Sequence, residues 1–217
     1  MVYFKNTFFL VIGFIILASC EPSISFTDPQ PINTENVFEF PKRYRGRYFS
    51  SDGNSILVVG NNFLTRINEF DVETLLKDID SNWVFEGSFI VDKELDKKYS
   101  YKKNGDTLIV HHRDEDTFFE FDSEHVVRKL KGFYFLNTNI ISGVWEVQKL
   151  DFGHNEVNCC SISTVFDFED LKEVTNTSKE QVLPFKFSPT SKQFKRFVWK
   201  NGFKKCELYT RKRFIIK

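Results

Sequence analysis

The sequence predicts a mainly β fold of the α+β class: antiparallel meanders in two related halves, with a C-terminal amphipathic helix. Three observations support this prediction. The chain of 217 residues holds 26 Phe and a single Met, and Phe, Tyr and Val recur at alternate positions, as they do in strands. Short turn signals, among them Asn104-Gly105, divide these stretches into hairpins. Segments of the first half also recur in the second.

Residues 42–121 form the predicted first β-rich half. Turn signals at Asp52-Gly53-Asn54, Gly60-Asn61-Asn62 and Asn104-Gly105 separate its strands. The acidic run Asp114-Glu115-Asp116 is expected to be a further turn. Residues 70–76 fit either a strand or a short helix. The expected strands are residues 45–50, 55–59, 63–68, 83–91 (with a break at Gly87), 99–103, 107–112 and 118–121.

The second half, residues 122–217, begins like the first. The segment RYRGRYF at residues 43–49 is echoed by KLKGFYF at residues 129–135. Thr34-Glu35-Asn36-Val37 is likewise echoed by Ser123-Glu124-His125-Val126. We therefore expect Gly46 to be equivalent to Gly132, and Tyr48 to Tyr134. The alternative is that hairpins rich in Lys, Gly and Tyr resemble one another by chance.

The second half also carries the helices. Residues 167–174 are expected to form two short turns, and residues 192–200 a helix that stops at Asn201-Gly202. Phe194, Phe197 and Val198 share one apolar stripe of this helix, and its other positions are largely basic. Such a helix can contact anionic lipid, but packing on the core is the expectation we favour. Strands are expected at residues 144–150, 156–163 and 205–214.

Residues 1–19 are typical of a secretory signal peptide. The apolar run at residues 8–17 is too short to span a bilayer, which takes about 20 apolar residues. It ends in Leu17-Ala18-Ser19-Cys20, the pattern of a bacterial lipobox, in which acyl chains such as palmitate are added to the cysteine. The alternative is an ordinary signal peptide in which Cys20 is incidental. A lipidated Cys20 would place the protein in the cell envelope, outside the cytoplasm, anchored to a membrane.

The segment after the anchor, residues 20–41, contains four prolines and no clear periodicity. We expect an extended tether that could reach about 60 Å if it were fully polyproline-like. Part of it lying on the domain as an edge segment is the alternative.

Composition and motifs exclude several classes of function. Lys and Arg number 30 and Asp and Glu number 30, so no charge excess points to nucleic acid. The sequence contains no Gly-rich phosphate loop, His-Glu-x-x-His, Gly-x-Ser-x-Gly or Cys-x-x-Cys motif. No cofactor and no catalytic residue are predicted. His111 and His112 are weak candidate metal ligands, because neighbouring residues on a strand face opposite sides.

Three cysteines remain beside Cys20. Cys206 could form a disulfide with Cys159 or with Cys160, or all three thiols could be buried and reduced, which we slightly favour. Cys159 and Cys160 should face opposite sides of a strand, which argues against a bond between them. Cys206 shares a strand face with Leu208, so we expect it to be buried.

Taken together, several stretches resemble a family of uncharacterised envelope lipoproteins of Bacteroidota, of the flavobacterial type. They are the lipobox, residues 26–31, residues 41–48, KGFYFLN at residues 131–137 with Trp145 and Val147, and PTSKQFKRFV at residues 189–198 with residues 201–203. The resemblance implies a location but no activity. Cys159 and Cys160 depart from it.

The sequence therefore favours a membrane-anchored lipoprotein that acts as a non-catalytic binding or interaction module. A lipocalin-like carrier of a small apolar ligand is the alternative, because Gly-x-Tyr at a first strand resembles the Gly-x-Trp of lipocalins. An envelope hydrolase is the third expectation.

Overall fold

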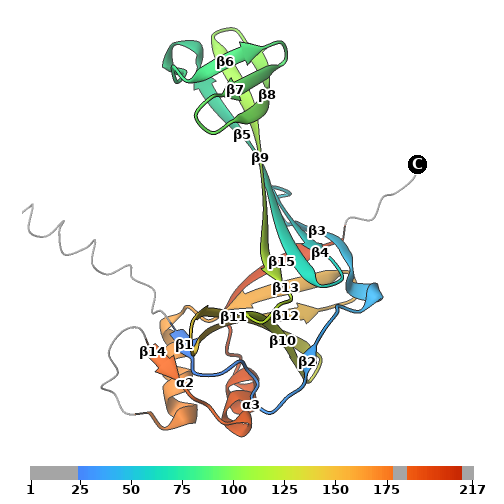
Figure 1. The fold of residues 1–217 in the computed structure, drawn as a ribbon, viewed down its shortest axis with the longest axis vertical. Coiled ribbons are helices and arrows are strands. Elements are labelled where there is room, and N and C mark those ends of the chain that lie inside the picture. The colour runs from blue at the N-terminus through green and yellow to red at the C-terminus, as the bar shows by residue number, and fades with distance from the viewer. Residues whose placement is uncertain (1–23, 178–184, 212–217) are drawn as a thin grey trace, which may run out of the picture.

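The computed structural model describes residues 24–177 and 185–211. They form a mainly antiparallel β structure with two α-helices, as the sequence predicted (Figure 1). One continuous sheet runs in the order β2-β10-β11-β12-β13-β15-β3-β4-β5-β9-β8-β7-β6. The short strands β1 and β14 lie off this path, paired with each other and, through β1, with β12.

The elements of the first half follow one another as hairpins. They are β1 (Ile24–Phe26), β2 (Asn36–Val37), a 3-10 turn (Lys42–Tyr44), β3 (Gly46–Ser50), β4 (Ser55–Val59), β5 (Phe63–Leu75), a second 3-10 turn (Leu76–Asp78), β6 (Trp83–Glu86), β7 (Phe89–Asp92), β8 (Lys97–Asn104) and β9 (Thr107–Glu120). The second half comprises β10 (His125–Leu130), β11 (Phe133–Ile141), β12 (Val144–Phe152), β13 (Glu156–Ser161), α2 (Val165–Thr175), β14 (Phe185–Phe187), α3 (Ser191–Trp199) and β15 (Lys205–Thr210).

The sheet curls around a single core, here called the inner core. All nine strands from β10 to β9 in the sheet order contribute side chains to it. Phe40, from the loop before β3, closes this core, and its ring centroid lies 5.1 Å from that of Phe121 and 5.9 Å from that of Tyr134. Burial of these large rings stabilises the curled sheet. The inner core consists of Phe40, Tyr48, Leu57, Val59, Leu64, Phe119, Val127, Tyr134, Leu136, Leu150, Val157, Cys159 and Tyr209.

A second core, here called the helix-side core, lies on the other face of the sheet under α2 and α3. Phe194, Phe197 and Val198 are buried in it, so the amphipathic helix packs on the domain, as favoured above. Both helices begin with a capping box, at Thr164 and Thr190, which satisfies free backbone N–H groups of the first turn.

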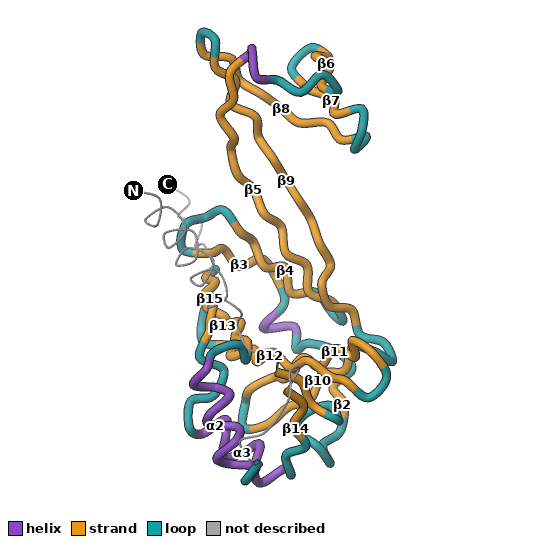
Figure 2. Tube along the Cα trace, turned by 90° about the vertical axis from the view of Figure 1, so that its left-hand side faces the viewer, coloured by secondary structure: helices purple, strands orange, loops and turns teal. Residues whose placement is uncertain are grey.

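A long hairpin carries part of the chain away from the body. Strand β5 pairs with β9 from Phe63 opposite Glu120 to Leu75 opposite Thr107. At its far end, residues 72–110 form a separate lobe with its own small core around Ile90. We call these residues the distal lobe, and we call residues 69–71 with 111–113, which join the lobe to the body, the ribbon. Figures 1 and 2 show the lobe at one end of the long axis and the helices at the other.

The two halves share their strand order and pairing register. In the first, Val59 pairs with Leu64 across a four-residue turn that begins at Gly60. In the second, Phe152 and Val157 pair in the same way around Gly153. In both turns the glycine N–H donates to the carbonyl three residues later, at 2.9 Å. A Cβ at either glycine would collide with the side chain of that later residue.

The tyrosines of the repeated segments also occupy equivalent places. Tyr48 pairs with Leu57 and Tyr134 pairs with Leu150, and each leucine lies three residues before its turn glycine. Each half then adds a fourth strand, β9 beside β5 and β15 beside β13. The distal lobe and the helix layer therefore lie at the same topological point of the two meanders, between the third and the fourth strand.

The prediction of an extended tether is wrong from Ile24 onward, where the chain lies on the domain as in the alternative given above. Phe26, Gln30 and Phe40 are fully buried, and β1 pairs with β12 and β14. The amide of Asn137 fixes the backbone of Gln30 by accepting from its N–H and donating to its carbonyl oxygen. Residues 24–41 thus lie against the body. Burial of the aromatic side chains of Phe26 and Phe40 stabilises the segment there.

Two local predictions also differ from the structure. The acidic run at residues 114–116 continues β9 and is not a turn, because this strand pairs with β5 where polar side chains remain in water. The interruption expected at Gly87 is confirmed: β6 and β7 are separated by a turn there, and the φ of Gly87 is +63°. The two short turns expected at residues 167–174 are one helix, α2. Residues 70–75 are strand, one of the two alternatives expected there, and Leu76 begins the second 3-10 turn.

The cysteines differ in part from the expectation. Cys159 and Cys160 face opposite sides of β13, in the inner core and the helix-side core respectively. Cys160 forms a disulfide with Cys206, directly opposite it on β15, so the fully reduced state favoured above is not observed. Cys206 is exposed, because Tyr209 and not Leu208 supplies the buried side chain of β15. Cys159 is buried and free.

We predict one free thiol, that of Cys159, when a Cys20→Ser form is denatured without reduction and titrated. Reduction should lower the free energy of unfolding by about 4 kcal/mol, because the bond closes a loop across 46 positions. The matched variant Cys159→Ala should show no thiol and keep the disulfide. Three thiols in the unreduced protein would contradict the pairing.

Candidate functional site

A hollow opens in the body where β15 and β3 separate. The two strands pair only at Tyr209 with Ser50 and at Thr210 with Phe49, so the remaining edge of β15 is left without β3 as a neighbour. The hollow has a volume of about 560 Å³. Its described lining comprises Ser50, Ser51, Asp52, Ser55, Arg66, Asn68, Cys206, Glu207, Leu208 and Tyr209.

Three side chains form a polar network in this hollow. The Tyr209 hydroxyl donates to Oε2 of Glu207 at 2.8 Å, and Nη2 of Arg66 lies 3.4 Å from the same oxygen. The guanidinium of Arg66 also lies over the ring of Phe118, 5.0 Å from its centroid. Burial raises the pKa of Tyr209. The tyrosine is therefore a neutral hydrogen-bond donor at physiological pH.

The polar groups around the hollow are largely hydrogen-bond donors. The carboxylate of Asp52 is occupied by the hydroxyl of Ser50 and the N–H of Asn54. The described residues that line the hollow offer hydroxyl, amide and guanidinium donors, but they include no histidine to act as a base near neutral pH. The nearby thiol of Cys159 is inert, because burial raises its pKa to about 11.

A second cluster lies on one face of the sheet at the base of the distal lobe. Asp71, His111 and Ser100 stand side by side on β5, β9 and β8. Nδ1 of His111 lies 2.9 Å from Oδ1 of Asp71. A hollow of about 290 Å³ adjoins the three residues.

This row lacks the features of a Ser-His-Asp triad. Within the described ranges, the Ser100 side chain makes no hydrogen bond to His111, and a nucleophile needs its base within hydrogen-bond reach. The side chains of His111 and Asp71 are 46% and 60% exposed, so water is not excluded. The cluster therefore gives no support to a hydrolase.

His112 lies on the opposite face of β9, as the strand geometry predicted. Its ring stacks on Phe70, with centroids 5.3 Å apart and planes 6° apart, and lies 4.5 Å from the ring of Tyr99. Burial lowers the pKa of His112, and the nearby His111 and Lys97 lower it further. His112 is thus a neutral packing residue near pH 7. Among the described residues no group of three or more potential ligands could hold a metal ion.

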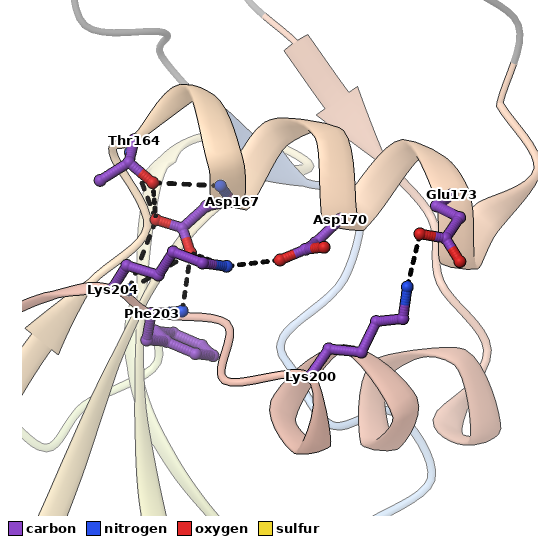
Figure 3. A network of polar contacts seen from close by, with 7 residues as sticks. All are labelled: Thr164, Asp167, Asp170, Glu173, Lys200, Phe203 and Lys204. Atoms are coloured by element: carbon purple, nitrogen blue, oxygen red, sulfur yellow. Dashed lines mark hydrogen bonds and ion pairs between the residues drawn. The ribbon is translucent and has the colours of Figure 1, made fainter.

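The sequence analysis missed a buried carboxylate that fixes the helix layer (Figure 3). Asp167, with no exposed surface, accepts from the Thr164 hydroxyl at 2.7 Å and from the N–H groups of Phe203 at 2.9 Å and Lys204 at 3.2 Å. It therefore ties the start of α2 to the link between α3 and β15. Two ion pairs beside it, Lys204 with Asp170 and Lys200 with Glu173, connect the same segments.

The lipidation candidate Cys20 lies outside the described residues. No helix in the part of the chain that the structure describes is long and apolar enough to cross a membrane. Comparisons of the chain with protein-family models, with curated proteins and with solved structures found no match. The resemblance to Bacteroidota lipoproteins therefore stays a prediction.

We predict that Asp167→Ala lowers the free energy of unfolding by about 2–4 kcal/mol, because it leaves buried N–H groups without an acceptor. Urea denaturation at neutral pH would measure the loss. The matched control Glu173→Ala removes only exposed ion pairs and should change stability by less than about 1 kcal/mol. Equal losses in both variants would contradict the role of Asp167 as the clamp of the helix layer.

Proposed function

We propose that the protein is a lipid-anchored protein of the cell envelope that holds an interaction lobe away from its body. The anchor in this proposal is Cys20, at the end of the signal sequence. The proposal assigns no catalytic role, and it rests on one structural observation above all, the separation of the distal lobe from the body by the ribbon.

The distal lobe has the composition of a surface that binds another protein. Phe85 on β6 and Phe89 on β7 are 44% and 45% exposed, and Leu95 in the turn after β7 is 60% exposed. Strand β6 ends the sheet, so within the described residues its outer edge has no neighbouring strand. Exposed aromatic side chains beside a free strand edge favour recognition of another chain.

The position of the body relative to the anchor supports the same proposal. Only three residues separate Cys20 from Ile24, the first residue of β1. A lipidated Cys20 would hold the body close to the bilayer. The lobe lies at the far end of the long axis from the helices (Figure 1), which would place it out in the surrounding compartment.

A carrier function finds less support. A carrier needs an internal space, but the centre of the curled sheet is occupied by packed rings. The ring of Phe152 lies 5.6 Å from that of Tyr134 and 4.4 Å from that of Tyr44, centroid to centroid. The space that a lipocalin-like carrier would use is filled by the protein's own side chains.

We predict that Cys20→Ser moves the protein from the membrane pellet to the soluble fraction in detergent-free buffer. The domain should stay folded, because its cores begin at Ile24. Thermal unfolding of the soluble variant should match that of the wild-type chain in detergent. The neighbouring Ser19→Ala variant, which keeps a small residue before the cysteine, should remain in the membrane. A Cys20→Ser protein that still sediments with the membrane would contradict the proposed anchor.

A further inference from the structure

We propose that Val165 and Phe166, at the start of α2, insert into the surface of the membrane that holds Cys20. This inference rests on the proposed lipid anchor and adds a second point of contact. It assigns to the bilayer two apolar side chains that the rest of the fold leaves exposed.

The side chains of Val165 and Phe166 are more exposed to solvent than Val and Phe side chains usually are. Val165 is 63% exposed and Phe166 is 72% exposed, although they are consecutive residues in the first turn of a helix. The apolar residues that follow on α2 turn inward: Leu171 and Val174 are buried in the helix-side core. Packing within the fold therefore accounts for the rest of the helix but not for the exposure of its first two residues.

The chain enters the body next to this turn. Ile24 pairs with Phe185 on β14, and the ring of Phe185 lies 4.0 Å from that of Phe168, centroid to centroid. Val165 precedes Phe168 by three positions, so the two residues lie on the same side of α2. Figure 1 shows β1, β14 and α2 together on one side of the body.

Covalent geometry then limits where the bilayer can be. Cys20 precedes Ile24 by four positions, so their Cα atoms lie at most about 14 Å apart. Acyl chains on Cys20 must enter the bilayer within that distance of β1. Apolar side chains at the membrane surface reach about 5–10 Å into the boundary between headgroups and acyl chains. The anchor therefore holds the lipid surface close to this turn of α2, and the lipid surface is the partner that we assign to Val165 and Phe166.

The charges around the turn permit this contact. Lys186, opposite Ser25 on β14, is exposed and suits anionic headgroups. The nearest acidic residues of α2 have partners within the fold. Asp167 is buried and its Oδ1 lies 3.8 Å from Nζ of Lys204, Asp170 pairs with the same lysine, and Glu169 lies 3.7 Å from Nζ of Lys172. Two attachment points would stop the body from pivoting about Cys20, which would keep the distal lobe directed away from the membrane.

A photoreactive phospholipid with a diazirine in its acyl chain tests this inference. The full lipidated protein would be reconstituted into phosphatidylcholine vesicles with a minority of phosphatidylglycerol, irradiated, digested and mapped. We expect label on the peptide that contains Val165 and Phe166 and none on the peptide that contains Phe85 and Phe89. In Val165→Ser/Phe166→Ser, labelling of α2 should fall to the level of the lobe peptide.

The matched variant Phe85→Ser/Phe89→Ser, which also removes two exposed apolar residues, should leave the labelling of α2 unchanged. Vesicle-bound protein whose α2 peptide is labelled no more than its lobe peptide would overturn the inference and leave the lipid anchor standing. Wild-type protein that fails to sediment with the vesicles would overturn both.

Discussion

The pairing of β5 with β9 is the constraint on which the rest of the structure depends. Near the body, Leu64 and Phe119 lie opposite each other and both enter the inner core. At the far end, β9 supplies Leu108 and Val110 to the core of the distal lobe, and β5 remains paired with β9 there. An isolated two-stranded ribbon is marginally stable in water. Here it persists because both of its ends are fixed in cores.

Between the two cores the ribbon depends on a few cross-strand contacts. Arg113 donates to Glu69 at 2.9 Å, and on the other face Phe70 stacks on His112. Such pairs contribute about 0.2–1 kcal/mol each. Charged side chains along this exposed stretch also discourage pairing with another chain. The acidic run at residues 114–116, which resembles a turn in the sequence, is thus explained as the solvated part of a long strand.

The sequence could predict what depends on local pattern and could not predict what depends on distant partners. The hairpin at Gly60, the equivalence of Tyr48 and Tyr134, and helix α3 follow from short-range signals. The network of Arg66 with Glu207 joins residues 141 positions apart, and no local pattern indicates it. Asp167 was detectable in part, because Thr164 three residues earlier completes a capping pattern, but its bonds to the segment after α3 were not. The four prolines of residues 20–41 favour an extended tether. Phe40 in the same segment favours burial on the domain, because a large apolar side chain is usually buried, and the structure follows Phe40.

Small-angle X-ray scattering on the Cys20→Ser protein tests the central claim, that the distal lobe stands apart from the body. Leu75 lies directly opposite Thr107, so an Asn-Gly turn can replace residues 76–106 and close the hairpin. We predict that the full protein gives an extended distance distribution with a separate long-distance shoulder. In the shortened variant the shoulder should disappear while the body keeps its fold. A single compact peak for the full protein, with a maximum dimension unchanged by removal of the lobe, would contradict the account.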